Sequence, residues 1–311
     1  MNPSLLRGAI ALAGLLLVGG AVAGALLILG GGGEAAPDRP PPTAVVLAAG
    51  DIGDCEEPGD EATVKVLASH PEATILALGD LAYPHGEPGD FDKCYEPTWG
   101  RFADRTKPAP GNHDYATKDA AGYFEYFGTA AGDPDKGWYS FDVGAWHIVS
   151  LNSECRRVGG CEPHEPQAQW LIGDLRENSD KCQLAYFHRP PFTSGRYRDD
   201  TKNVTRMRVL WRILVDHDVE IVLVGHEHSY ERFTPMDGDG NADPIGTRLF
   251  VVGTGGGNLR EYRDPPLPTT DVRNDDTWGV LKLALGPTTY KWEFLPAAGG
   301  DFTDAGSGNC R

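Results

Sequence analysis

Two histidines separated by a single residue follow a run of apolar residues in the second half of the chain. The segment 221–232 reads IVLVGHEHSYER, so His226 and His228 come just after the apolar run IVLV. Residues i and i+2 of an extended chain point to the same side, and the two imidazoles can therefore converge just past the end of a strand. Two surface histidines in a loop would give the same short pattern, so the choice depends on the rest of the chain.

Polar side chains suited to metal binding or acid–base chemistry occur in four other segments in a similar way. Asp51 follows the apolar run 44–49, Asp80 and Tyr83 follow 74–78, Asn112 and His113 lie in PAPGNHD (108–114), and His188 follows 183–187. Open α/β sheets place their binding sites at strand ends. Five such coincidences in one chain are strong evidence for a shared site.

The possible metal donors in this set are two aspartates, a tyrosine, an asparagine and three histidines: Asp51, Asp80, Tyr83, Asn112, His188, His226 and His228. This number exceeds the needs of one catalytic metal, which usually takes about three protein ligands plus water. The donors suit two metal ions roughly 3.5–4 Å apart with one bridging carboxylate. Such a pair can hold a phosphoryl oxygen and make hydroxide available at moderate pH.

Five short motifs resemble, in the same order, those of the calcineurin-like metallophosphoesterases and, within them, the purple acid phosphatases. The motifs are DIG (51–53), GDLAY (79–83), GNHD (111–114), FHRP (187–190) and GHEHSYER (225–232). The resemblance extends over about 44–295. It implies an α/β fold in which central β-sheets are flanked by helices, as a four-layer sandwich.

The resemblance also implies how the donors divide between two metal ions. An iron(III) ion would be bound by Asp51, Asp80, Tyr83 and His228, and a divalent iron, zinc or manganese ion by Asp80, Asn112, His188 and His226. Asp80 would then bridge the two ions, and the two histidines of the fifth motif would bind different ions.

Tyr83 distinguishes this chain from most of the wider superfamily. That superfamily usually has D-x-H in the first motif, whereas Gly53 stands at the histidine position here. A tyrosinate three residues after Asp80 can replace the missing ligand, and its hard anionic oxygen favours a hard trivalent iron. A packing role for the ring is the competing interpretation. His113 is the expected acid for the leaving group, with a structural hydrogen-bonding role as its alternative.

The function implied by the resemblance is a binuclear phosphatase, which the N-terminal segment described below would place outside the cytoplasm. It would hydrolyse small phosphate monoesters by attack of a metal-bound hydroxide. A phosphodiesterase or nucleotidase with the same metal centre is an alternative that the sequence leaves open. A surface binding protein that keeps the fold without catalysis is a third possibility, and the complete donor set together with His113 argues against it.

Two loops contribute further expectations about the site. The plant-type enzymes carry additional histidines shortly after the fourth motif, whereas segment 190–200 offers Arg196 and Arg198 instead. These arginines either bind phosphate through paired hydrogen bonds or are solvated loop charges. The segment GTGGG (253–257) follows an apolar run without opening an obvious helix. It predicts a tight loop near the site and argues against a nucleotide cradle.

The elements that must position these residues are short apolar runs alternating with helical patterns. Strands are predicted at 44–49, 74–78, 145–151, 183–187, 221–224, 248–253, 278–285 and 289–295, and helices at 63–69, 167–176 and 204–215. Alternating strands and helices followed by β-rich segments are typical of an α/β domain with central sheets. We therefore assign residues 44–311 to a single catalytic domain.

The charge of the chain limits its partners. The net charge is −17, and all of it lies on residues 44–311, because the acidic and basic residues before this range cancel. So acidic a domain would repel a phosphate backbone, which argues against nucleic acid as a partner. A small anionic substrate would need local positive charge, such as that of metal ions.

Residues 1–43 are predicted to be a membrane anchor or signal segment followed by a Gly/Pro-rich linker. Ile10 to Leu29 is a 20-residue run without charge, long enough for a membrane-spanning helix, and Arg7 precedes it. The positive flank places the following domain outside the cytoplasm. Cleavage after the AVA sequence at 21–23 is the alternative, although the apolar run continues beyond it. Either way, the catalytic domain is expected to be extracytoplasmic, held at the membrane or secreted.

The six cysteines fit an exported protein. Cys155 and Cys161 flank a short loop and are expected to pair. Cys55, Cys94, Cys182 and Cys310 would supply two more disulfides. None of the six shows the C-x-x-C spacing typical of a metal site, so disulfides are favoured over metal binding.

Overall fold

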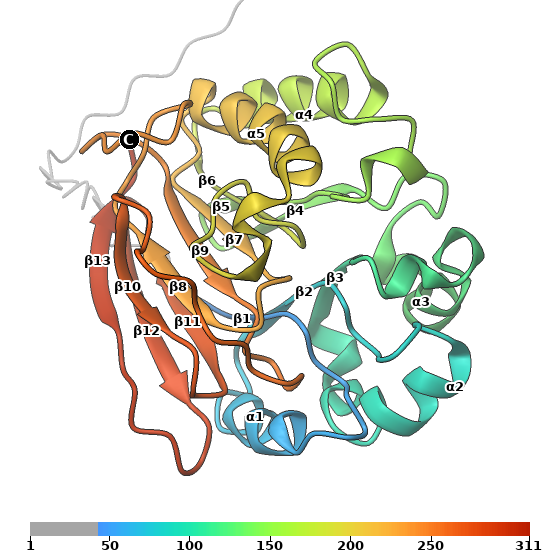
Figure 1. Ribbon diagram of the computed structural model, residues 1–311. Coiled ribbons are helices and arrows are strands. Elements are labelled where there is room, and N and C mark those ends of the chain that lie inside the picture. Colours follow the sequence, from blue (N-terminus) through green and yellow to red (C-terminus); the bar gives the residue numbers. More distant parts are fainter. Residues whose placement is uncertain (1–42) are drawn as a thin grey trace, which may run out of the picture. The chain divides into compact units, whose positions relative to one another are not determined.

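The structure is a computed structural model that describes residues 43–311 and contains two β-sheets (Figure 1). The predicted N-terminal hydrophobic helix falls within residues 1–42 and so lies outside the described residues. Between residues 43 and 311, no helix is long and apolar enough to cross a membrane.

The first sheet has six strands in the order β13-β12-β11-β1-β2-β3. They are β1 (Ala44–Ala49), β2 (Thr74–Leu78), β3 (Thr106–Ala109), β11 (Gly279–Leu285), β12 (Thr289–Pro296) and β13 (Ala305–Asn309). Strands β1, β2 and β3 are parallel, whereas β11, β12 and β13 join antiparallel on the other side of β1. The carboxyl ends of the parallel strands therefore lie at one edge of this sheet.

The second sheet has seven strands in the order β10-β8-β9-β7-β6-β5-β4. They are β4 (Tyr139–Val143), β5 (Trp146–Ser150), β6 (Cys182–Phe187), β7 (Ile221–Val224), β8 (Tyr230–Phe233), β9 (Arg248–Val252) and β10 (Thr270–Asn274). Strands β5, β6, β7 and β9 form its parallel centre. The outer strands β4, β8 and β10 pair antiparallel.

Helices lie around the two sheets. They are α1 (Gly59–Ala68), α2 (Pro88–Asp90), α3 (Ala121–Phe127), α4 (Pro166–Glu177) and α5 (Thr201–Asp216). Helices α4 and α5 cover the second sheet, and α1 packs against β11 of the first (Figure 1). The prediction of central sheets flanked by helices is confirmed.

Alternation along the central strands separates two apolar cores. On β6, Leu184 and Tyr186 face the core between the sheets, whereas Ala185 and Phe187 face the core under α4 and α5. Successive side chains of a strand point to opposite faces, so a strand covered on both faces must be apolar throughout. This is why continuous apolar runs marked these strands in the sequence.

The predicted strands match the observed ones to within a residue or two, but five strands were missed. Strand β3 (TKPA) contains lysine and proline, and β13 (AGSGN) has no large apolar residue. Strand β4 is half-buried, and β8 and β10 are rich in polar residues. Helix α1 begins at Gly59, four residues earlier than expected, because its first turn (GDEA) carries no apolar periodicity.

The six cysteines form three disulfides. Cys155 is bonded to Cys161 as predicted, and the other bonds are Cys55–Cys94 and Cys182–Cys310. The preference for disulfides over a cysteine metal site is therefore confirmed.

Candidate metal centre

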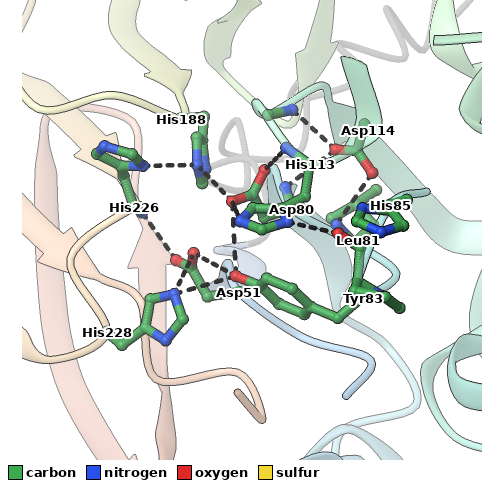
Figure 2. Close-up of polar contacts among 12 residues, drawn as sticks. Asp51, Asp80, Leu81, Tyr83, His85, His113, Asp114, His188, His226 and His228 are labelled. Carbon is green, nitrogen blue, oxygen red and sulfur yellow. Dashed lines mark hydrogen bonds and ion pairs between the residues drawn. The ribbon is translucent and has the colours of Figure 1, made fainter. Parts of the chain in front are cut away.

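The predicted donor residues follow the carboxyl ends of parallel strands from both sheets. Asp51 follows β1, Asp80 and Tyr83 follow β2, Asn112 follows β3, His188 follows β6, and His226 and His228 follow β7. Their side chains, apart from that of Asn112, contact one another directly (Figure 2).

One group of candidate metal ligands lies around the Tyr83 hydroxyl. This oxygen lies 3.0 Å from Oδ1 of Asp51, to which it donates, and 3.0 Å from Nε2 of His228. Nε2 of His228 in turn lies 3.2 Å from Oδ1 of Asp51. The Tyr83 oxygen is also 3.5 Å from Oδ2 of Asp80. These are the four residues expected to share one metal ion.

A second group forms on the other side of Asp80. Nε2 of His188 lies 3.1 Å from Oδ2 of Asp80, and Nδ1 of His226 lies 3.2 Å from that Nε2. The candidate ligand atoms of these three residues all lie within 4.8 Å of one another. Asp80 belongs to both groups, as a bridging carboxylate must.

Backbone carbonyls orient two of the histidines. Nδ1 of His188 donates to the carbonyl of Leu78 at 2.9 Å, and Nδ1 of His228 donates to the carbonyl of Asn258 at 2.7 Å. A carbonyl can only accept, so Nδ1 carries a proton in each histidine, and Nε2 is the nitrogen that faces the centre. Such hydrogen bonds are typical of metal-binding histidines.

The third histidine is held the opposite way round. Nη1 of Arg189 donates to Nε2 of His226 at 3.0 Å. Because Nε2 accepts this hydrogen bond, Nδ1 of His226 carries the proton and faces His188 and Asp80, and this proton must leave Nδ1 before the atom can bind a metal ion. The ring of Tyr197 stacks on that of His226, with centroids 4.1 Å apart, and fixes its plane.

Asp114 positions the segments that carry Asp80 and Asn112. Its carboxylate accepts hydrogen bonds from the backbone N–H groups of Asp80 (3.0 Å), Leu81 (3.2 Å) and Gly111 (2.8 Å). Burial, together with the charge of Asp80, raises the pKa of Asp114 to about 7. A Cβ at Gly111 would lie 2.2 Å from Oδ1 of Asp80, so only glycine fits there.

Three of the donor residues have a backbone conformation that is rare outside glycine. The φ angles are +58° for Asp51, +52° for Asp80 and +71° for His226. Such conformations cost of order 1–3 kcal/mol and cluster at functional sites. Local hydrogen bonds hold them, including that from the N–H of His226 to Oδ2 of Asp51 at 2.8 Å.

Mutual electrostatics shift the titration of the buried groups. Burial favours neutral Asp51, but the imidazoles of His228 and His188 outweigh it and lower the pKa of Asp51. The pKa of Asp80 is lowered in the same way, with burial opposed mainly by His188. Burial opposes the positive charge of His188, but Asp80 raises the pKa of His188 to about 9. Burial and the two carboxylates raise the pKa of Tyr83 well above 10.

Asn112 supplies a direct test of whether the chain fits a metal ion. Its Oδ1 is buried, and no group among residues 43–311 donates a hydrogen bond to it. Buried polar atoms are rarely left without a partner. An amide oxygen is a suitable ligand for a divalent cation, so the orphaned atom fits the metal centre expected from the sequence.

His113 stands at the edge of the centre with its side chain 36% exposed. Its Nδ1 donates to the carbonyl of Pro84 at 2.6 Å, and its backbone N–H donates to Oδ1 of Asp80 at 2.7 Å. Nε2 lies 3.9 Å from Oδ2 of Asp80. The nitrogen free to exchange a proton therefore faces the centre and solvent, as an acid for a leaving group requires.

Two arginines near the centre were missed by sequence reasoning. Arg189 lies within the quoted motif FHRP, and its position beside His188 was the available signal. The backbone N–H of Arg260 donates to the carbonyl of His228 at 3.0 Å. Nε of Arg260 is buried and has no hydrogen-bond partner among the described residues. Arg260 follows the GTGGG loop, whose glycines gave no hint of it.

The loop predictions had different outcomes. Nη1 of Arg198 donates to the carbonyl of Pro265 at 2.6 Å, and the backbone N–H of Arg196 donates to Glu227. Within residues 43–311, neither arginine side chain forms a hydrogen bond or ion pair with a predicted metal ligand. GTGGG is a tight loop at the site as predicted, since the N–H of Gly257 donates to the carbonyl of Asp51 at 2.8 Å.

Comparison with known proteins supports the same assignment. Residues 44–230 match the family model described as calcineurin-like phosphoesterase. The chain is 25% identical over 272 residues to probable purple acid phosphatase 20 of Arabidopsis thaliana, a match covering 79% of this chain and 60% of that protein. It is 30% identical over 183 residues to human acid phosphatase type 7, a match covering 52% and 41% of the two chains.

Solved structures share the fold. The purple acid phosphatase PPD1 from yellow lupin matches with a TM-score of 0.69 and 19% identity over 85% of this chain and 53% of that one. GAP50, described as the anchor in the inner membrane complex of Plasmodium, matches with a TM-score of 0.66 and 14% identity over 86% and 89% of the chains.

The chain spans between 41% and 60% of the length of the two curated relatives named above. The family match nevertheless covers more than half of this chain, and it includes the first four motifs in full and the fifth as far as residue 230. The resemblance stated from the motifs is confirmed: the chain belongs to the calcineurin-like phosphoesterases, and its relatives include purple acid phosphatases.

Proposed function

We propose that the chain is a binuclear metal-dependent phosphatase that hydrolyses phosphate monoesters. The observation that carries this proposal is the pair of donor groups that meet at Asp80, one around Tyr83 and one around His188. A single structural metal would not require a second group of buried donors on the far side of the shared carboxylate.

The chain's residues would hold the ions as the resemblance implies. Asp51, Asp80, Tyr83 and His228 would bind iron(III), and Asp80, Asn112, His188 and His226 would bind a divalent ion. When bound, such a pair acts as a Lewis acid toward phosphoryl oxygens and lowers the pKa of water.

Side chains around the metal ligands would bind the phosphate, transfer a proton and exclude water. Arg189, which holds His226, can compensate phosphate charge from one side, and Arg260, next to His228, can do so from the other. His113 would give its Nε2 proton to the leaving oxygen, because Nδ1 is tied to Pro84. Tyr197 covers His226 and keeps water from its ring.

Two other functions are compared with a monoester phosphatase: a phosphodiesterase or nucleotidase, and a binding protein without catalysis. The open edge at His113 does not by itself distinguish a monoester from a diester, so a phosphodiesterase or nucleotidase would use the same centre. The likeness to an anchor protein of Plasmodium concerns the fold alone. The complete donor set favours an enzyme over a binding protein.

We also infer that the domain is exported, held by the hydrophobic run from Ile10 to Leu29 or released by cleavage. The three disulfides support an oxidising compartment. A free Cys155 thiol in native protein would count against this inference.

The decisive experiment uses the full chain, produced under oxidising conditions and kept in mild detergent. Metal content is measured by mass spectrometry, and hydrolysis is compared on p-nitrophenyl phosphate and bis(p-nitrophenyl) phosphate. We expect two metals per chain and faster hydrolysis of the monoester. Faster hydrolysis of the diester would select the phosphodiesterase alternative, and metal binding without hydrolysis would select the binding protein.

A further inference from the structure

A cavity of about 480 Å³ whose charged side chains are mainly cationic opens beside the proposed metal centre. Its charged lining consists of Arg156, Arg157, Arg189, Lys202 and Arg206, with Glu154 and Asp200 as the acidic members. The whole chain carries a net charge of −17. A local excess of positive charge in so acidic a protein attracts anions to this place in particular.

Most of the positive charge in the cavity has no acidic partner. Glu154 is paired with Arg189, and Asp200 accepts a hydrogen bond from the backbone N–H at the start of α5. Arg156, Lys202 and Arg206 form no ion pair with any residue between 43 and 311. These cations are therefore available to an anionic ligand.

Arg189 joins the cavity to the metal centre. One edge of its guanidinium donates to Nε2 of His226 at 3.0 Å, and its Nε pairs with Glu154 in the cavity wall. A single side chain thus separates the cavity from a proposed metal ligand. The cavity therefore lies next to the side of the centre that His226 and Arg189 form.

The loop that presents Arg156 is constrained by the covalent structure. The disulfide Cys155–Cys161 closes a loop of a few residues, and both cysteines are buried while Arg156 and Arg157 are exposed. A cation held on a constrained loop loses less conformational entropy when it binds a ligand. Guanidinium groups match phosphate oxygens through paired hydrogen bonds.

We propose that this basic cavity binds a second phosphate of the substrate, so that the enzyme prefers organic diphosphates to esters with a single phosphate. The inference rests on the proposed phosphatase function. Water attacks the terminal phosphorus, and the bond from that phosphorus to the bridging oxygen breaks. The bridging oxygen leaves with the inner phosphate, and the products are inorganic phosphate, the shorter phosphate ester and one proton released to solvent.

The test compares ADP with AMP, which differ by one phosphate. We expect the wild-type chain to have the higher kcat/KM for ADP. The double variant Arg156→Gln/Arg206→Gln should lose about tenfold of the ADP-over-AMP preference, mainly through KM, because each contact is partly screened by solvent. Arg176→Gln removes an exposed arginine of α4 outside the cavity and should leave both rates unchanged.

A binding measurement separates this inference from the proposed function. Imidodiphosphate keeps two phosphates and resists hydrolysis, and calorimetry should show about tenfold weaker binding to the double variant than to the wild type or Arg176→Gln. If the wild type hydrolyses neither these nucleotides nor p-nitrophenyl phosphate, the proposed function fails, and the affinity for imidodiphosphate alone then shows whether the cavity binds a second phosphate. Equal affinity in all three proteins, or an ADP preference unchanged in a double variant with wild-type circular dichroism, overturns the inference.

Discussion

Two clusters of this protein bury histidine against aspartate, and they differ in how fully their polar atoms are satisfied. In the first, His147 lies between Asp142 and Asp174, with Nδ1 and Nε2 at 2.9 and 2.8 Å from the carboxylates. Lys181 pairs with the other oxygen of Asp142 at 2.7 Å, and Ser140 donates to the other oxygen of Asp174 at 2.8 Å. Each of these charges already has a partner.

The proposed metal centre is the second cluster, and not all of its polar atoms have a partner. Oδ1 of Asn112 has no partner among the described residues, and Asp51, Asp80 and His226 have positive φ angles. Neither feature occurs at His147. A buried histidine beside carboxylates is therefore not enough to identify a metal-binding site. A buried oxygen without a hydrogen-bond partner, together with strained backbone, favours a metal-binding site over a structural ion-pair cluster.

The largest loss of activity is expected when a metal ligand of the group formed by Asp80, His188 and His226 is replaced. Asp80→Asn and His188→Ala should each lower kcat/KM for p-nitrophenyl phosphate by more than about 100-fold, beyond the effect of residues that only support ligands. Metal analysis should show loss of the divalent ion, while circular dichroism stays unchanged. Both metals retained in both variants would contradict the two-metal assignment.

A smaller loss is expected for Asp114, which positions ligands through backbone N–H groups. Asp114→Asn keeps the size of the side chain but replaces one acceptor oxygen with an amide, which cannot accept from the N–H of Gly111 or Leu81. Supporting residues of metal sites typically contribute 10–100-fold, so we expect about a 10-fold fall in kcat/KM with weaker metal retention on dialysis. A fall as large as that of Asp80→Asn would make Asp114 a ligand itself.

Tyr83→Phe should change the spectrum more than the rate. A phenolate bound to iron(III) transfers charge to the metal on excitation, so the wild type should absorb in the visible and the variant should not. Asp51, Asp80 and His228 would still hold the ion, and we expect activity to fall by no more than about 10-fold. A wild type with confirmed ferric iron and no visible band would refute the tyrosinate assignment. A colourless protein that contains only zinc or manganese would refute the assignment of iron and leave the proposed phosphatase function standing.

The sequence predicted which polar side chains come together better than it predicted their surroundings, for a physical reason. Each donor directly follows a buried strand or a glycine-containing motif, and both features are local patterns. Arg260 and Tyr197 reach the centre from loops distant in sequence, through contacts that exist only after folding. Strands β4 and β13 escaped prediction likewise, since half-exposed or glycine-rich edges have no continuous apolar run.

The smallest effect on activity is expected for a change at His147, in the cluster whose polar atoms all have partners. The same change should affect stability. Burial opposes the charge on His147, but hydrogen bonds with Asp174 and Asp142 outweigh it and raise the pKa of His147. A raised pKa means that the charged form is stabilised in the folded state. The contribution is therefore complete below the unfolded-state pKa of about 6.5 and is lost as the pH rises through the higher folded-state pKa.

His147→Gln keeps a polar side chain but cannot carry the charge that pairs with both carboxylates. We expect it to lower the free energy of unfolding by about 1–3 kcal/mol at pH 6, the usual range for losing hydrogen bonds to a charged group. The deficit should shrink at alkaline pH, as the wild-type imidazole loses its proton. Urea denaturation at pH 6 and pH 9 measures the difference, and kcat/KM should match the wild type. A stability deficit that grows with pH would contradict the role given to the charge of His147. A loss of bound metal would show that the His147 cluster and the proposed metal centre depend on each other.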